Sequence, residues 1–100
     1  MALRRVDDFL GNPVEFSQSW SFSGHSSRSD AEKNELARQA VEGKAKQWVL
    51  ERKAAGQAIE FDHVQLIDNR NVWSDTETDW QGKTTHKCGG LGVGYLFVNV

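Results

Sequence analysis

Apolar and polar residues alternate from Val14 to Phe22, which is the pattern of a β-strand with one buried face. The apolar side chains, among them Phe16 and Trp20, stand at even-numbered positions, whereas the odd-numbered positions are mostly serine. A face of small, mildly polar side chains can meet water or lie against a second subunit at little desolvation cost, and the pattern is compatible with both arrangements.

The residues before this strand, 1–13, mix charged with apolar side chains and end in a Gly-Asn-Pro turn. We interpret them as a short N-terminal arm. The rest of the chain, 14–100, is expected to form a single domain, because 100 residues are enough for one core and too few for two.

A helix is predicted from Ser29 to about Ala55. Ser29 and Glu32 have the spacing of a capping box at its start, and Gly56 supplies a left-handed stop at its end. One stripe of this helix is apolar and is expected to face the sheet: Ala37, Val41, Ala45, Trp48 and Ala55.

A second line on the helix, Leu36, Gly43 and Leu50, repeats at intervals of seven residues and lies to one side of the first. Leucines outside the core stripe indicate a contact with a partner. The alternative is that Leu36 and Leu50 flank the same core or are singly exposed, as surface leucines commonly are.

The segment after Gly56 predicts a strand with a β-bulge near Asp62 and His63, because its apolar residues change parity between Phe61 and Val64. Residues 68–79 are polar and turn-rich. We expect a long loop or an irregular short hairpin there.

The end of the chain predicts a tight hairpin. Gly89-Gly90 is a candidate two-residue turn between a strand ending at Cys88 and one starting at Leu91, so Cys88 would lie opposite Leu91. A strand with apolar residues on both parities is expected to be buried on both faces. The last strand has this property: Leu91, Val93, Tyr95 and Phe97 share one parity, and Leu96, Val98 and Val100 share the other.

These elements predict an α+β fold in which one long helix packs on an antiparallel sheet of about four strands, in the order β-α-β-β-β. One helix covers one face of such a sheet, and a chain of 100 residues has little left to cover the other. We therefore expect a homo-oligomer, with contacts formed by Leu36, Gly43, Leu50, Leu96 and Val98.

Charge and composition narrow the class of protein. Twelve Lys and Arg residues stand against fourteen Asp and Glu, so no broad basic face is expected and nucleic acid is excluded as a main partner. The single cysteine, Cys88, cannot form an internal disulfide. No apolar run approaches the roughly 20 residues of a membrane span. We expect a soluble cytoplasmic protein that does not bind membranes.

Three carboxylates, Asp75, Glu77 and Asp79, stand at alternate positions, which is the rhythm of a loop that wraps oxygen ligands around Ca²⁺. An EF-hand loop counted from Asp75 would need glycine and glutamate where Trp80 and His86 stand. We interpret the segment as a solvated acidic loop and predict no metal site.

His86 and Cys88 are expected on one face of a strand, but no third residue that would orient a His–Cys pair is evident. A structural zinc site needs about four converging ligands, and the chain holds one cysteine and three histidines. The sequence therefore predicts no catalytic residue and no cofactor.

Two of the four tryptophans, Trp73 and Trp80, flank the acidic segment and fit no core pattern. Aromatic side chains at a loop edge can anchor a protein partner or stack on a planar ligand. The alternative is local packing within the loop. The candidate binding residues are Trp73, Asp75, Glu77, Asp79 and Trp80.

A strand leads through the turn Gly24-His25-Ser26-Ser27-Arg28-Ser29 into an alanine-bearing helix, and the sheet then ends in an apolar strand. In this order the chain resembles the dodecins, small flavin-binding shells with a β-α-β-β subunit. The aromatic residue that sandwiches the flavin in that family is not found at the head of the second strand, and residues 68–81 are a long insertion. We therefore transfer no flavin-binding residue. The resemblance implies an oligomer in which helices and sheets cover one another.

Taken together, the sequence favours a non-catalytic protein–protein interaction module of the small inhibitor or adaptor type, whose partners are itself and another protein. One alternative is a homo-oligomer that binds a small aromatic ligand through Trp73 or Trp80. A second alternative is a small enzyme that uses His86 and His63 for acid–base chemistry.

Overall fold

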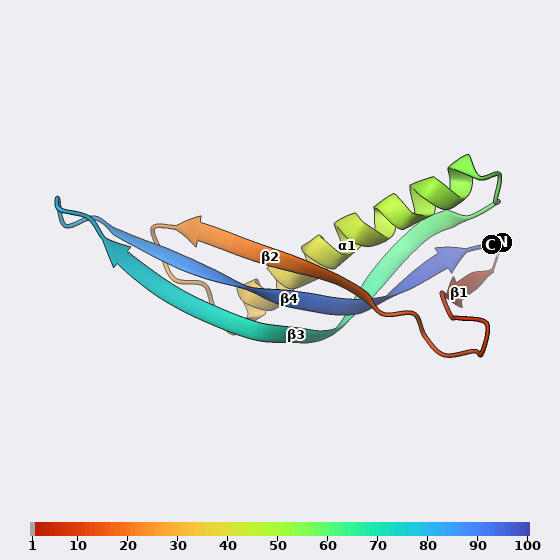
Figure 1. Ribbon diagram of the computed structural model, residues 1–100, viewed down its shortest axis with the longest axis horizontal. Coiled ribbons are helices and arrows are strands. Elements are labelled where there is room, and N and C mark those ends of the chain that lie inside the picture. The colour runs from red at the N-terminus through yellow and green to blue at the C-terminus, as the bar shows by residue number, and fades with distance from the viewer. Residues whose placement is uncertain (1) are drawn as a thin grey trace.

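The structure is a computed structural model that describes residues 2–100, so Met1 of the expected arm lies outside the described residues. Its elements follow one another as β1 (Leu3–Arg5), β2 (Phe16–Gly24), α1 (Asp30–Ala54), β3 (Glu60–Thr78) and β4 (Thr84–Asn99). Helix α1 lies across one face of a four-stranded antiparallel sheet (Figure 1). The predicted α+β class, one long helix on an antiparallel sheet of four strands, is confirmed, with two strands before the helix and two after it instead of the predicted one and three.

Strand β4 is the centre of the sheet. It pairs with β3 from Thr84 to Asn99 along one edge. Strands β2 and β1 share its other edge, because β2 pairs with residues 86–94 and β1 with residues 97–99. The segment expected as an N-terminal arm therefore supplies β1, which fills the edge of β4 beyond the end of β2.

The predicted turn at Gly89-Gly90 is wrong, because both residues lie inside the unbroken strand β4. Cys88 is opposite Phe22 rather than Leu91. The loop expected over residues 68–79 is also wrong, since all but the last of these residues belong to β3.

The hairpin instead turns between β3 and β4, at residues 79–83. The Asp79 carboxylate accepts hydrogen bonds from the backbone N–H groups of Gln81 and Lys83, at 2.9 Å each. Gly82 takes the left-handed conformation there, with φ +83°. The bulge expected near Asp62 and His63 is confirmed by a register shift between Phe61 and His63.

The helix begins as predicted. The Ser29 hydroxyl accepts the Glu32 N–H at 3.2 Å, and the Glu32 carboxylate accepts the Ser29 N–H at 3.0 Å, which together form the capping box. Four residues of α1 are buried against the sheet: Ala37, Val41, Ala45 and Val49. The expected stripe is corrected at its end, where Val49 is buried, Trp48 is half-buried and Ala55 is exposed.

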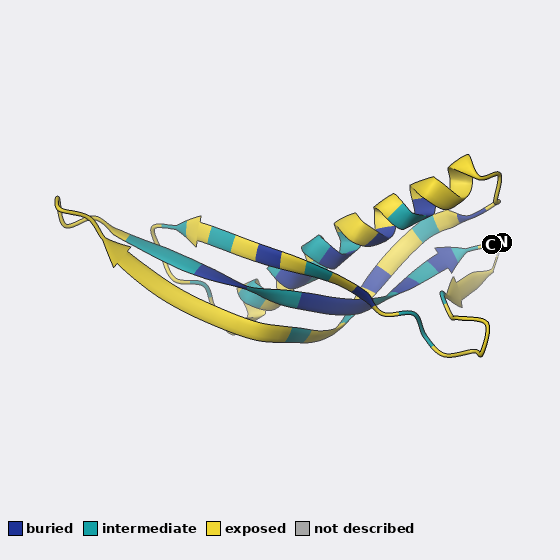
Figure 2. Cartoon of the chain, viewed as in Figure 1, coloured by how far each residue is buried: buried dark blue, intermediate teal, exposed yellow. Residues whose placement is uncertain are grey.

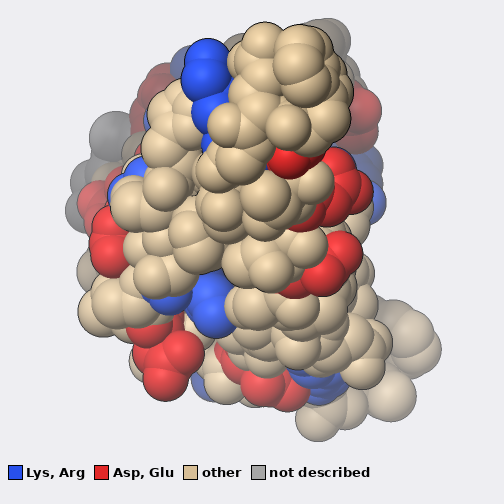
Figure 3. All heavy atoms as spheres, turned by 90° about the vertical axis from the view of Figure 1, so that its left-hand side faces the viewer, with Lys and Arg blue, Asp and Glu red and all other residues tan. Residues whose placement is uncertain are grey.

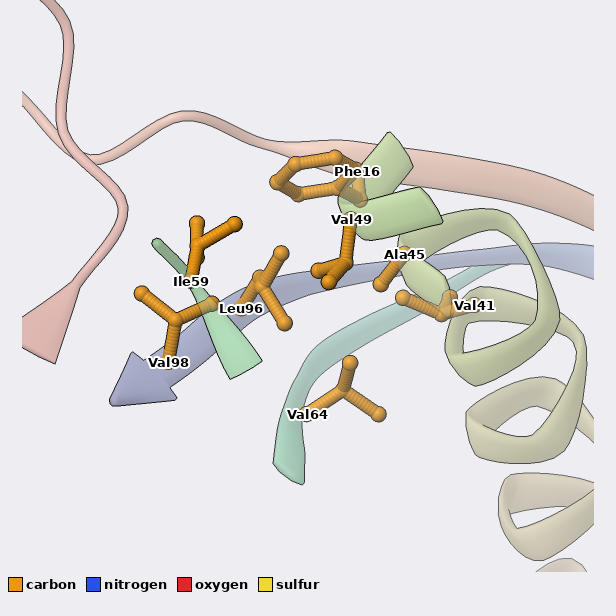
Figure 4. Packing of buried hydrophobic residues seen from close by; sticks show 8 residues of the cluster. All are labelled: Phe16, Val41, Ala45, Val49, Ile59, Val64, Leu96 and Val98. Atoms are coloured by element: carbon orange, nitrogen blue, oxygen red, sulfur yellow. The ribbon is translucent and has the colours of Figure 1, made fainter. Parts of the chain in front are cut away.

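The core lies on the helix side of the sheet. Its larger cluster comprises Phe16, Val41, Ala45, Val49, Ile59, Val64, Leu96 and Val98 (Figure 4). A smaller cluster, nearer the start of the helix, joins Trp20, Ala37 and Cys88. Within residues 2–100 no helix is long and apolar enough to cross a membrane.

The subunit is long and narrow, with extents of 56 × 24 × 17 Å. Its radius of gyration is 16.9 Å, whereas a chain of this length usually folds to about 13 Å. Its accessible surface is 6433 Å², about 700 Å² more than the roughly 5,700 Å² expected for its mass. The fold thus exposes more surface than an average domain of its mass.

Candidate interaction surfaces

The sheet face opposite α1, called the open face below, has no second layer among residues 2–100. Successive side chains of a strand point to opposite faces of the sheet. The even-numbered side chains of β4 face the helix, so its odd-numbered side chains point to the open face. An apolar row along β4 forms its middle, with β2 serines on one side and polar β3 residues on the other. The row consists of Leu91, Val93, Tyr95 and Phe97.

Side chains of the subunit itself shield much of this row. The rings of Phe97 and His63 stack at 4.6 Å with an interplanar angle of 2°. The Arg5 guanidinium lies 5.7 Å from the centre of the Tyr95 ring. Val93 is only 1% exposed. The open face is therefore largely protected without a partner, and β4 is buried or half-buried along most of its length (Figure 2).

Charged side chains beside the row are paired with one another. The Asp62 carboxylate lies 2.6 Å from Nδ1 of His63 and accepts the Asn99 amide at 3.1 Å. Hydrogen bonds from His63 and Asn99 hold the pKa of Asp62 below its usual value. The Arg70 guanidinium pairs with Asp68 at 2.8 Å, which likewise lowers the pKa of that carboxyl.

The structure places the sequence-predicted binding residues on the outer half of the β3–β4 hairpin. Trp80 is 91% exposed at the tip and Trp73 is 47% exposed. The Glu77 carboxylate pairs with Lys87 at 2.9 Å, while Asp79 is engaged in the turn. Within residues 2–100 no group of three His, Cys, Asp or Glu side chains converges as metal ligands would.

Charges of both signs are interspersed at this end of the molecule, without a large patch of one sign (Figure 3).

Trp73 packs against the sheet as well as lying beside the acidic segment. A β-carbon on Gly89 would lie 2.8 Å from its ring, so the indole rests directly on the backbone of β4. The two tryptophans are therefore in different environments, and Trp80 is the freely presented one.

The residues predicted as oligomer contacts separate into two groups. Leu96 and Val98 face the helix and are buried inside the subunit, so their assignment to a subunit contact is corrected. Leu36, Gly43 and Leu50 lie on the helix as expected: Leu36 is half-buried against the smaller cluster, and Leu50 is 60% exposed. Apart from its chain neighbours and the backbone of the helix itself, nothing lies within 4 Å of a β-carbon placed on Gly43.

A groove of about 740 Å³ runs between α1 and β2, beside the outer edge of β2. Phe16 and Trp48 form its apolar part, with their rings edge to face at 5.8 Å. Ala40 and Gly43 line the helix side. The spacing of Leu36, Gly43 and Leu50 predicts that Gly43 lies outside the core-facing stripe of the helix, but it does not predict this groove.

A smaller pocket of about 320 Å³ lies where the turn before α1 meets the β3–β4 hairpin. Lys33 Nζ donates to the Ser74 hydroxyl at 2.8 Å at its rim. The Arg28 guanidinium lies 4.3 Å from the centre of the Phe22 ring and pairs with Glu32 at 2.9 Å. The pocket combines an aromatic wall with several cationic groups.

The two histidines of the enzyme alternative are not brought together. His63 is opposite Phe97 and His86 is itself in β4, so about 35 Å of strand separates them. Cys88 is a free cysteine buried at 4% exposure in the smaller core cluster.

No family model matches this chain, and no curated protein or solved structure matches it significantly. The order β2, α1, β3, β4 agrees with the β-α-β-β order of the dodecins, but none of these comparisons shows membership of that family.

Proposed function

We propose that this chain is a non-catalytic protein–protein interaction module of the small inhibitor or adaptor type that associates with itself and with another protein. The observation that carries self-association is the surplus of surface. The subunit exposes about 700 Å² more than a domain of its mass usually does. Each partner in a standard protein–protein interface buries roughly 800 Å².

The outer half of the hairpin supports the second contact, with another protein. Trp80 projects from the tip almost fully exposed, on a turn whose backbone is held by Asp79. Exposed tryptophans are frequent anchors of interfaces because one side chain buries a large area at little cost in conformational entropy. Interspersed charges around it are typical of the polar rim of such a contact.

The non-catalytic part of the proposal rests on the separation of His63 and His86, which lie too far apart along the sheet to act together on one substrate. The proposal keeps the cytosol as the compartment, since Cys88 is a free thiol packed in the core.

Two measurements test this function. Light scattering should give a multiple of 11.3 kDa for the wild-type chain. Proteins captured from cell extract by the wild-type chain should be lost with Trp80→Ala and retained with Phe9→Ala. Phe9 is the matched control, because it is an aromatic residue 94% exposed in the segment between β1 and β2, and Figure 1 shows this segment at the opposite end of the molecule from the hairpin tip. Equal capture by all three proteins would overturn the assignment of the tip.

A small-ligand-binding oligomer is a second candidate, favoured by the pocket of about 320 Å³ beside Phe22. Its volume is at the lower end of the range for ligand sites, and its cationic groups suit a planar anion. Titration with a flavin should then quench tryptophan fluorescence, and Phe22→Ala should abolish the quenching. A wild-type chain that shows no quenching would remove this candidate.

A further inference from the structure

The outer edge of β2 is a free strand edge that the chain leaves unprotected. Strand β2 pairs with β4 over nine residues in one continuous register, from Phe16 opposite Gly94 to Gly24 opposite His86. Within residues 2–100 no strand lies on its other side. An unpaired edge of this length is a template for pairing with a further strand.

The other edge of the sheet, formed by β3, is protected in the ways that natural proteins use. Three register shifts interrupt its pairing with β4, and Asn71 adopts a left-handed φ of 54°. Paired charges follow its length, among them Asp68 with Arg70 and Glu77 with Lys87. Strand β2 has neither device, since its register with β4 is continuous and it carries no charge.

The backbone N–H and C=O groups that lie along this free edge belong to the serines of β2. In β4, Leu96 accepts the N–H of Val6, and Val100 exchanges two hydrogen bonds with Ala2, so even-numbered residues of β4 point toward the β1 and β2 side. The even-numbered residues of β2 pair with these, from Phe16 to Gly24. The N–H and C=O groups that point outward therefore belong to the odd-numbered residues: Ser17, Ser19, Ser21 and Ser23.

We propose that a second copy of this chain pairs its β2 antiparallel to this edge, so that two subunits form one continuous sheet with both helices on the same face. This inference rests on the proposed self-association and names its site. Full overlap of the two strands places Trp20 on the twofold axis. It brings Ser19 opposite Ser21 of the second copy, both with outward hydrogen-bonding groups.

A second copy suits this edge better than an unrelated strand for two reasons. The pairing is self-complementary, because serine meets serine at the odd-numbered positions and β2 carries no charge that would oppose its own copy. The groove between α1 and β2 opens beside the same edge, and in this register Gln18, which lines the groove, lies opposite Phe22 of the second copy. A second copy at this site would cover both the edge and the groove.

The open face is a weaker site for the second copy. Its apolar row is already shielded by His63, Arg5 and Trp73, and Val93 is buried within the subunit. The free edge of β2 therefore needs a hydrogen-bonding partner more than the apolar row of the open face needs a cover.

The test is Ser19→Pro compared with Ser19→Thr, each measured by light scattering and circular dichroism. Proline removes one outward N–H and leaves the hydrogen bonds between β2 and β4 intact, whereas threonine keeps the N–H. We expect folded monomers of 11.3 kDa for Ser19→Pro and the wild-type mass for Ser19→Thr. A folded Ser19→Pro chain with the wild-type oligomeric mass overturns the edge pairing and leaves the proposed self-association standing. A wild-type chain that is monomeric overturns both.

Cysteine cross-linking decides the matter if Ser19→Pro fails to fold. The double variant Ser19→Cys with Ser21→Cys should form a covalent dimer on mild oxidation, because opposed residues of paired strands have Cα atoms about 5.5 Å apart, within disulfide reach. Neither single variant should do so, because Ser19 would not lie opposite itself. The native Cys88 is buried and does not compete. Absence of a covalent dimer from the double variant contradicts the pairing.

Discussion

The carbonyl oxygen of Ala37 lies 2.7 Å from the position that a β-carbon on Gly92 would occupy. Helix α1 therefore rests directly on the backbone of β4. Gly94 repeats the arrangement, with its missing β-carbon 3.2 Å from a methyl group of Val41. Glycines in the central strand let a helix with an alanine-rich face lie close to the sheet.

We predict that Gly92→Ala destabilises the protein by about 1–3 kcal/mol, because the methyl group would push the helix backbone away from the sheet. Urea unfolding measures the change. The control is Gly43→Ala in the same helix, at the groove beside β2, where no side chain or other element lies within 4 Å of the new methyl group. That variant should gain about 0.5–1 kcal/mol from its lower backbone entropy when unfolded. A Gly92→Ala protein as stable as wild type would refute the close approach.

Asn69 joins three elements through its side chain. Its Oδ1 accepts the Trp20 indole N–H at 2.7 Å, and its amide donates to Oδ1 of Asn34 at 3.1 Å. Asn69→Ala leaves a part-buried indole N–H without its partner, so unfolding free energy should fall by about 1–2 kcal/mol. Gln65→Ala, an exposed change in the same strand, should stay within about 0.5 kcal/mol of wild type. Equal effects of the two changes would show that the Asn69 bonds add nothing.

The two hairpin tryptophans should differ in their effect on stability. Trp73 packs on the backbone at Gly89, so Trp73→Ala should cost about 1–2 kcal/mol. Trp80→Ala should change stability by no more than about 0.5 kcal/mol, since its side chain meets almost no protein. Thermal unfolding of both variants separates these roles. A large loss of stability with Trp80→Ala would mean that Trp80 is structural and would weaken its assignment to partner binding.

Acid stability should depend on Glu32. Its carboxylate accepts the Ser29 backbone N–H and pairs with Arg28, and these contacts hold the pKa of Glu32 below its usual value. A carboxyl group with a lowered folded-state pKa stabilises the protein above its unfolded pKa, and this contribution disappears as the pH falls through the folded pKa. The urea midpoint of wild type should therefore fall more steeply in that acidic range than the midpoint of Glu32→Gln. Parallel curves for the two proteins would contradict this linkage.

The sequence predicted the elements whose signals are local. The capping box of Ser29 and Glu32 located the start of α1, and the change of parity after Phe61 located the bulge in β3. Alternation from Val14 to Phe22 identified the strand that the structure records as Phe16–Gly24. Each of these signals depends on residues adjacent to one another in the chain, so no tertiary information was needed.

The errors arose where tertiary contacts determine the residue type. Gly89 and Gly90 resemble a turn, yet the backbone at Gly89 is bare because Trp73 packs on it. The outer half of β3 resembles a loop, because an exposed edge strand lacks the apolar parity of a buried one. The prediction of a subunit contact for Leu96 and Val98 is wrong for a similar reason. Strand β4 has apolar residues at both odd and even positions, and the sequence does not show which of the two sets faces the helix.

The candidate surfaces were predicted only in part. Trp80 stood out in the sequence because it fits no core period, and the structure places it at the exposed tip of the hairpin. The sequence does not predict the free edge of β2, because a strand can be recognised as an edge strand only when its pairing partners are known. The odd-numbered serines of β2 are compatible with either solvent or a second subunit, and the sequence alone does not distinguish the two.

The mass of the wild-type chain in solution, measured by sedimentation equilibrium across a wide range of concentrations, tests the central claim of self-association most directly. The account predicts a mass of twice 11.3 kDa, or a higher even multiple, that persists on dilution. A mass of 11.3 kDa at every concentration would contradict it.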